Sequence, residues 1–124
     1  MFEFLMRTAP ARAESLGRRG LTPNDSRALA CLAADGGRTM RSLAEEWKCD
    51  ASNATWIVDR LERLGLVERR TVPHDRRVKL VVLTRRGLKT KTDIMNDFLT
   101  PPGDLLEMDR SDLEALRRAL EKLQ

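Results

Sequence analysis

The residues of this 124-residue chain best suited to chemistry are cations gathered in one short stretch. Residues 69–79, RRTVPHDRRVK, hold five Lys or Arg side chains, one acid and one proline. Clustered cations attract polyanions, and guanidinium groups form paired hydrogen bonds with phosphate. The stretch therefore indicates a phosphate-rich partner, with a solvated turn as the simpler alternative.

Residues that could support catalysis or hold a metal are sparse. His74 is the single histidine, and the two cysteines, Cys31 and Cys49, lie in neither a CxxC nor a Cys/His spacing. A nucleophile needs a base beside it, and a zinc site needs about four ligands. We therefore expect no enzyme activity, no metal and no cofactor. Cys31 is expected to pack in the core, and Cys49 to be the exposed thiol of the two.

The charge of the chain is concentrated in its middle. The net charge is +4 and the pI is about 9.6. Residues 38–87 carry 12 Lys or Arg against 7 Asp or Glu, whereas residues 104–124 carry 4 against 6. The length suits one ordinary domain. No apolar run approaches the ~20 residues that cross a bilayer, so no membrane partner and a cytoplasmic location are expected.

Before the basic stretch, the sequence predicts three helices. Thr22 has the position of an N-cap, with Pro23 at the first helical residue and Asp25 three residues after the cap, and Gly36 and Gly37 are predicted to stop this helix. A second helix follows a cap at Thr39 and ends at Lys48. The third covers residues 51–64 behind Asp50 or Ser52, because its apolar residues recur at i, i+3, i+4 and i+7.

The basic stretch itself predicts a β-hairpin. LVERR and RVKLVVLT are typical of strands, TVPHD of a turn, and Val78, Leu80 and Val82 are expected on one face. Thr84 then caps a helix that ends at Pro101, and a last helix follows Asp109 or Ser111. The last helix repeats leucines at helical spacing, namely Leu113, Leu116, Leu120 and Leu123. The fold class is mainly α with a small antiparallel β-hairpin.

Several of these residues together resemble the MarR family of bacterial winged-helix regulators. The resemblance is carried by LT at 21–22, SLAEEW from 42, VDRLERLGLVER at 58–69, DRR at 75–77 and LTRRG at 83–87. It implies a winged helix-turn-helix at 21–87, with dimerisation helices in a shortened segment 1–20 and in 88–124. Pro10 is expected to interrupt the first of these helices.

The resemblance also implies which residues meet DNA through the helix at 51–64. The N-terminal end of such a helix enters the major groove, and there lie the candidates Ser52, Asn53, Thr55 and Trp56. Ser52 and Asn53 could instead only cap the helix, and Trp56 could cover a neighbouring helix. Asp59 is expected to pair with an arginine such as Arg60 or Arg63, because phosphate would repel it.

In the hairpin, the resemblance implies that Asp75 orients Arg77, which enters the minor groove. Arginine is favoured there by the negative potential of narrow A·T-rich stretches. The candidates for phosphate contacts are Arg76 and Lys79 on the hairpin, Arg69 and Arg70 before it, and Thr39, Arg41 and Ser42 at an earlier helix N-terminus. Ordinary capping is the alternative for this last group. His74 is expected to be a solvated turn residue.

The resemblance implies a homodimer that binds a pseudo-palindromic site on double-stranded DNA. By the resemblance, it would be a repressor released by an unidentified small-molecule effector. One alternative is a winged helix used only for protein–protein contact, which would not need cations converging on the hairpin. Another is a thiol-based redox sensor, but the family's peroxide-sensing branch uses a cysteine near the N-terminus, and none precedes Cys31 here.

Overall fold

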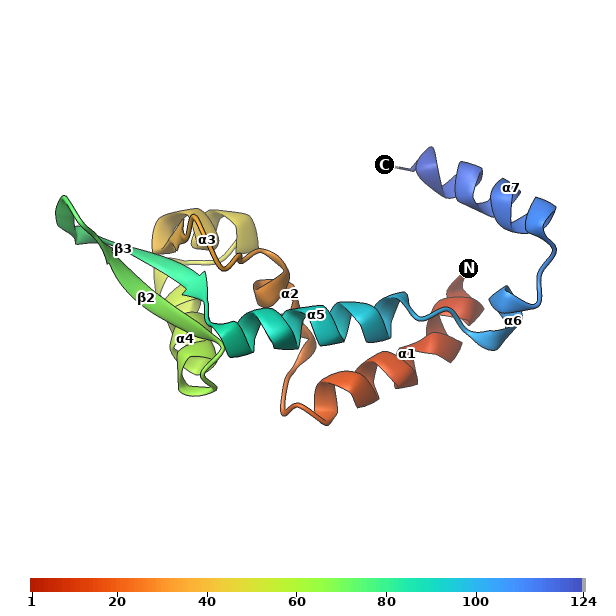
Figure 1. The fold of residues 1–124 in the computed structure, drawn as a ribbon, viewed down its shortest axis with the longest axis horizontal. Coiled ribbons are helices and arrows are strands. Elements are labelled where there is room, and N and C mark those ends of the chain that lie inside the picture. Colours follow the sequence, from red (N-terminus) through yellow and green to blue (C-terminus); the bar gives the residue numbers. More distant parts are fainter. Residues whose placement is uncertain (124) are drawn as a thin grey trace.

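The computed structural model describes residues 1–123, and Gln124, the last residue of the predicted segment 88–124, lies outside the described residues. The described chain forms seven helices and three strands. They are α1 (Phe2–Gly17), α2 (Pro23–Ala30), β1 (Arg38–Thr39), α3 (Met40–Trp47), α4 (Ala51–Arg63), β2 (Val67–Val72), β3 (Asp75–Leu83), α5 (Arg85–Leu99), α6 (Gly103–Leu106) and α7 (Arg110–Glu121). Figure 1 shows an elongated molecule: α3, α4 and the strands lie at one end, and α6 lies at the other.

One apolar core joins the helices to the base of the sheet. Leu29 of α2, Leu43 of α3, Val58 and Leu61 of α4 and Val81 of β3 are all buried in it. Each such side chain stabilises the fold by roughly 1.5–3 kcal/mol relative to an exposed one. The fold class predicted from the sequence, a winged helix-turn-helix within a mainly helical chain, is confirmed.

Threonine caps start the helices where the sequence predicts them. In α2, the Thr22 hydroxyl accepts from the Asp25 amide at 3.2 Å, and the Asp25 carboxylate accepts from the Thr22 amide at 2.8 Å. In α3 and α5, the hydroxyls of Thr39 and Thr84 likewise accept from the amides of Ser42 and Gly87, without the reciprocal bond. Each of these caps is worth about 1 kcal/mol.

The helix capped by Thr22 does not reach its predicted stop at Gly36 and Gly37, because α2 ends at Ala30. Gly36 and Gly37 instead lead the chain into β1. Gly37 has a φ of +47°, and a Cβ built on it would lie 2.7 Å from the Cβ of Leu80. The glycine is needed because β1 passes so close to β3.

The hairpin is the larger part of a three-stranded antiparallel sheet with the order β1-β3-β2. β1, which the sequence did not predict, pairs Arg38 with Val81 and Thr39 with Leu80. The face predicted for Val78, Leu80 and Val82 is the more protected one toward the tip, where Val78 and Leu80 are half-buried and Lys79 is exposed, but at the base Val81 and Leu83 lie in the core together with the buried Val82. The base of β3 is covered on both faces, so period-2 alternation does not apply there.

The predicted interruption at Pro10 is wrong, because α1 runs through this residue. Proline removes one N–H, so the carbonyl of Met6 loses its helical partner. Met6 is exposed, and water can take that place.

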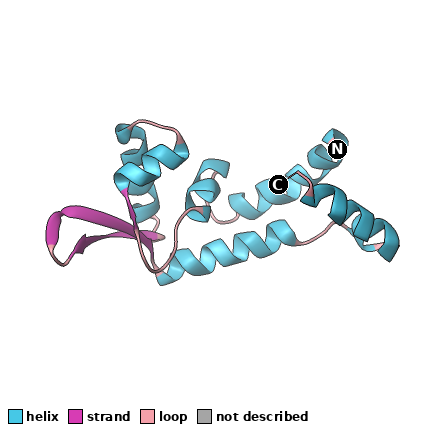
Figure 2. Cartoon of the chain, turned by 90° about the horizontal axis from the view of Figure 1, so that it is seen from above, coloured by secondary structure: helices cyan, strands magenta, loops and turns pink. Residues whose placement is uncertain are grey.

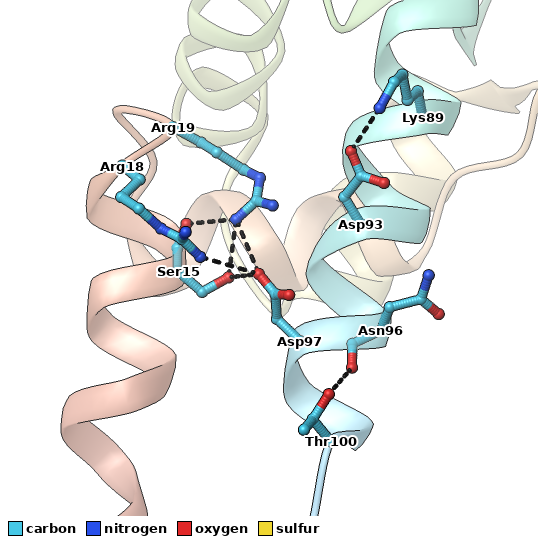
Figure 3. A network of polar contacts seen from close by, with 8 residues as sticks. All are labelled: Ser15, Arg18, Arg19, Lys89, Asp93, Asn96, Asp97 and Thr100. Atoms are coloured by element: carbon cyan, nitrogen blue, oxygen red, sulfur yellow. Dashed lines mark hydrogen bonds and ion pairs between the residues drawn. The ribbon is translucent and has the colours of Figure 1, made fainter.

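Polar contacts join the end of α1 to α5 (Figure 3). The buried Ser15 hydroxyl donates to the Asp97 carboxylate at 2.7 Å, and the Arg19 guanidinium donates to the same oxygen at 3.1 Å. These bonds, led by that from Ser15, lower the pKa of Asp97 below its ordinary value. These contacts hold the C-terminal end of α1 against the long helix α5.

The last helix, α7, projects away from the rest of the chain (Figure 1). Leu113, Leu116, Leu120 and Leu123 are 37%, 37%, 43% and 78% exposed. Among residues 1–123, no helix is long and apolar enough to span a membrane.

Candidate nucleic-acid interface

The N-terminus of α4 is held by Asp50. One oxygen of its carboxylate accepts from the Asn53 amide and from the Ser52 hydroxyl, both at 2.8 Å. These bonds, first that from the Asn53 amide, lower the pKa of Asp50 below its ordinary value. Because Asp50 is the cap, the side-chain amide of Asn53 is not needed for capping.

The two faces of α4 are sharply different. Ala54, Val58 and Leu61 are fully buried, while the opposite side carries the four side chains that we call the reading face, Ser52, Asn53, Thr55 and Trp56, all of them exposed. Trp56 is 57% exposed, so it does not cover a neighbouring helix. The Thr55 hydroxyl donates to the Ala51 carbonyl at 2.8 Å and keeps its lone pairs free to accept.

At the start of α3, the three side chains predicted to contact phosphate differ in the hydrogen bonds and ion pairs that they already make within the protein. The Thr39 hydroxyl accepts from the Ser42 amide at 3.1 Å. The Ser42 hydroxyl donates to the Thr39 carbonyl at 3.0 Å and accepts from Arg38 Nε at 3.2 Å. Arg41 is exposed and pairs only with the exposed Glu45. Arg41 is therefore the most available of the three.

The tip of the hairpin is irregular. β2 and β3 are joined by Pro73 and His74, and the register shifts between Thr71, which pairs with Lys79, and Val72, which pairs with Asp75. Between these partners, β3 holds three additional residues, 76–78. A bulge of this kind bends a strand and re-aims its side chains. Arg76 and Arg77 are both exposed within it.

Asp75 holds the backbone of the bulge. One oxygen of its carboxylate accepts from the Arg77 amide at 3.0 Å. The expectation that Asp75 orients Arg77 is therefore refined, since the bond is to the backbone and leaves the guanidinium exposed.

The remaining predicted cations fall into two groups. Arg69 is only 20% exposed in its side chain and binds Asp59 at 2.6 Å and Glu62 at 3.0 Å. Arg70 binds Glu68 at 2.7 Å through Nε. In contrast, Arg76, Arg77 and Lys79 make no ion pair within residues 1–123. We call these three the free wing cations.

Asp59 pairs with an arginine, as predicted, but with neither of the two arginines that were named. Asp59 pairs with Arg69 of β2, and Arg60 turns instead to Asp25 of α2. Asp59 and Arg60 are adjacent on a helix, so their side chains point about 100° apart and meet different neighbours.

The contact between Arg60 and Asp25 was not predicted at all. Arg60 Nε lies 3.2 Å from both oxygens of the Asp25 carboxylate, and Nη2 lies 3.1 Å from one of them and 3.2 Å from the Gly20 carbonyl. Burial of Asp25 raises its pKa, but hydrogen bonds from Arg60 and Thr22 outweigh this and lower the pKa below its ordinary value. The sequence indicates the capping role of Asp25 but not its burial, and it is the burial that calls for a cationic partner.

Both thiols are half-buried, so the expectation that Cys49 is the exposed one is wrong. They line the same open cavity of about 500 Å³, between α2, the α3–α4 turn and the start of α4. Burial and the neighbouring Glu46 carboxylate raise the pKa of Cys31. A raised pKa disfavours the reactive thiolate, which opposes a redox role for Cys31.

Comparison with known proteins supports this arrangement. The sequence profile of the MarR family matches residues 19–78. The chain is 25% identical over 91 residues to the HTH-type transcriptional regulator MhqR of Bacillus subtilis (strain 168), a match that covers 73% of this chain and 63% of MhqR. It is 35% identical over 78 residues to the HTH-type transcriptional repressor MdtR of the same organism, over 63% of this chain and 50% of MdtR. The matched regions thus span less than two thirds of either relative.

The fold is also similar to that of S. aureus MepR in a solved MepR–DNA complex. The TM-score is 0.74 at 22% identity, covering 99% of this chain and 98% of MepR. Both curated relatives are named as transcriptional regulators and not as enzymes, in agreement with the expectation from the sequence. The profile match, the two relatives and the shared winged-helix fold show that the chain is similar to MarR-family regulators over residues 19–78 and in its fold.

Proposed function

We propose that this protein is a sequence-specific regulator of transcription that binds double-stranded DNA as a homodimer. The observation that carries the proposal is the joint position of the reading face and the free wing cations. Both belong to elements at the same end of the molecule, opposite α6 (Figures 1 and 2). A duplex presents base edges beside phosphates and so offers partners to both sets of side chains.

In this proposal, the N-terminal half of α4 enters the major groove. A helix with side chains is ~10–12 Å wide, which suits a groove ~12 Å wide. Asn53 suits bidentate contact with adenine, and the hydroxyls of Ser52 and Thr55 can meet either bases or phosphates. Trp56 offers an apolar surface for a thymine methyl group or a sugar, together with one N–H donor.

The wing then reaches the adjacent minor groove. Arg77 is the side chain that inserts, since it is exposed within the bulge and its backbone is held by Asp75. Arg76 and Lys79 bind the flanking phosphates. Arg41 adds a contact at the start of α3, with Thr39 and Ser42 in a supporting role. Arg69 and Arg70 contribute least, because acidic neighbours already neutralise them.

The dimer is supported by the exposed leucines of α7. A helix of 12 residues is marginal on its own in water, so α7 needs a surface to cover its apolar side. Further exposed apolar side chains lie near the same end of the molecule, at Phe2, Leu5, Met6, Leu99 and Leu106. We assign segments 1–20 and 88–124 to dimerisation and 21–87 to DNA binding. A two-fold dimer implies a pseudo-palindromic site with half-sites about 34–36 Å apart.

We further infer that the protein is a repressor. MdtR is named a repressor, and MepR was solved bound to an oligodeoxyribonucleotide. Release by a small-molecule effector completes the proposal. The DNA partner implies a cytoplasmic location.

The test is selection of duplexes by the full-length chain, followed by affinity measurement over a salt series. A preferred pseudo-palindrome, bound with a steep negative slope of log K against log salt, is expected. A verified dimer that binds no duplex at low salt would refute the proposal and favour a protein–protein interaction module.

A further inference from the structure

The recognition helix α4 is held on two sides by charges that come from adjacent residues. Asp59 binds Arg69 of β2 at 2.6 Å, and Arg60 binds the carboxylate of Asp25 in α2 through three contacts of 3.1–3.2 Å. Arg60 Nη2 also donates to the carbonyl of Gly20, in the loop between α1 and α2. Ion pairs from two adjacent residues therefore join α4 to β2 of the wing and to α2.

These two ion pairs oppose rotation of α4 about its own axis, a motion that the apolar core restrains only weakly. Ala54, Val58 and Leu61 hold α4 against the core, but apolar contact is non-directional and tolerates small rotations about the helix axis. Hydrogen bonds are directional and weaken steeply when misaligned. Side-chain tips lie about 5–6 Å from a helix axis, so a rotation of about 10° moves them by about 1 Å. That is enough to disturb a hydrogen bond from the reading face to a base edge.

We propose that Arg60 is a positioning residue for DNA recognition, which fixes the rotation of α4 through Asp25 and so sets sequence specificity without touching DNA. The inference rests on the proposed function. It deepens that function, because it adds a specificity determinant outside the reading face.

The contacts of Arg60 argue against a direct role at the duplex. Its side chain is 29% exposed, and two of its nitrogens are already bonded to protein oxygens. Asp25 is almost fully buried and would be left as an uncompensated charge if Arg60 turned to a phosphate. The ion pair therefore stays closed when DNA is bound.

The experiment uses the double variant Asp25→Asn/Arg60→Met in the full-length chain. The pair is removed together, so that no buried charge is orphaned, and the Asn oxygen still accepts from the Thr22 amide. Arg63→Met is the matched control, since Arg63 is an exposed arginine on the same helix. Circular dichroism and thermal unfolding establish that each variant is folded at the working temperature. Affinity is then measured for the selected duplex and for a random duplex of equal length, each over a salt series.

For the double variant, affinity for the selected duplex is expected to fall about tenfold, the loss that follows when one base contact is disturbed. Affinity for the random duplex and the salt slope are expected to stay as in the wild type, because the phosphate contacts are untouched. The single variant Arg60→Lys keeps the positive charge but loses the bidentate geometry of the guanidinium. Its preference for the selected duplex is expected to lie between those of the double variant and the wild type.

Two results would overturn the inference while leaving the proposed function standing. One is an unchanged preference for the selected duplex in the folded double variant. The other is an equal loss on both duplexes with a slope shallower by ~0.9 per protomer, which would make Arg60 a phosphate contact. If the wild type itself prefers no sequence, the proposed function fails, and this inference with it.

Discussion

Replacing Arg77 with alanine tests the wing directly. Arg77 is exposed, and its side chain has no ion-pair partner within residues 1–123, while its backbone amide stays bonded to Asp75. The free energy of unfolding should therefore change by less than about 0.5 kcal/mol, as is usual for surface substitutions. Any large loss of DNA affinity would then come from the interface alone.

The size of that loss follows from one contact in each protomer. A specific contact is worth ~1–3 kcal/mol, and we take about 1–2 kcal/mol for a single exposed arginine. A dimer loses two such contacts, or about 2–4 kcal/mol, which corresponds to roughly 30- to 1,000-fold in affinity. The salt slope should become shallower by about 1.8, that is ~0.9 for each lost phosphate neutralisation.

The assay is fluorescence anisotropy with the selected duplex between about 50 and 200 mM salt, a range in which phosphate contacts change affinity strongly. Over this fourfold range, the deficit of the variant should shrink by about tenfold, because the lost contacts are the salt-sensitive ones. Lys89→Ala is the matched control: it removes one positive charge from α5, where Lys89 is exposed and pairs with Asp93. Its affinity should stay close to that of the wild type.

Two results would refute the reasoning. Equal affinities for Arg77→Ala and the wild type would remove the wing from the mechanism. A loss of equal size in Lys89→Ala would show that net charge matters, and not the position of Arg77.

Three further predictions concern assembly and stability. Leu116→Glu with Leu120→Glu should convert the dimer to a monomer in analytical ultracentrifugation, whereas Arg117→Glu, at an exposed position on the same helix, should leave it dimeric. Gly87→Ala should lower the free energy of unfolding by roughly 3 kcal/mol or more in urea titrations, because its Cβ would lie 1.8 Å from the Leu66 carbonyl oxygen, whereas Gly103→Ala meets no atom within 4 Å and should be tolerated. Asp25 has a folded pKa below its ordinary 3.8, so its contribution to stability is present above that pH and is lost as pH falls through the folded pKa. Urea unfolding at pH 7, 5 and 3 should accordingly show a smaller decrease for Asp25→Asn than for the wild type, and parallel decreases would contradict this reasoning.

The parts of the fold that the sequence predicted are those determined by local interactions. Thr22, Thr39 and Thr84 each bond an amide three residues away, so the cap and its helix appear in one short window. The apolar face of α4 could also be predicted from a short window, because the spacing of its buried residues repeats within one helix.

The features that escaped prediction depend on residues far apart in the chain. β1 is two residues long and exists only because β3 passes beside it. Asp59 and Arg60 are adjacent in sequence, yet their partners come from β2 and from a residue 35 positions away. Even the bulge in the wing is a property of the register between two strands. None of these features has a pattern within its own segment.

In the proposed dimer, the exposed leucines of α7 also link DNA binding to the abundance of the protein. Where the dimer is the DNA-binding species, its concentration at low expression rises with the square of the protomer concentration, by mass action. Operator occupancy then responds more steeply than in proportion when the amount of protein changes. In the proposed function, the uncovered side of one short helix thereby makes occupancy of the operator depend steeply on the concentration of the protein in the cell.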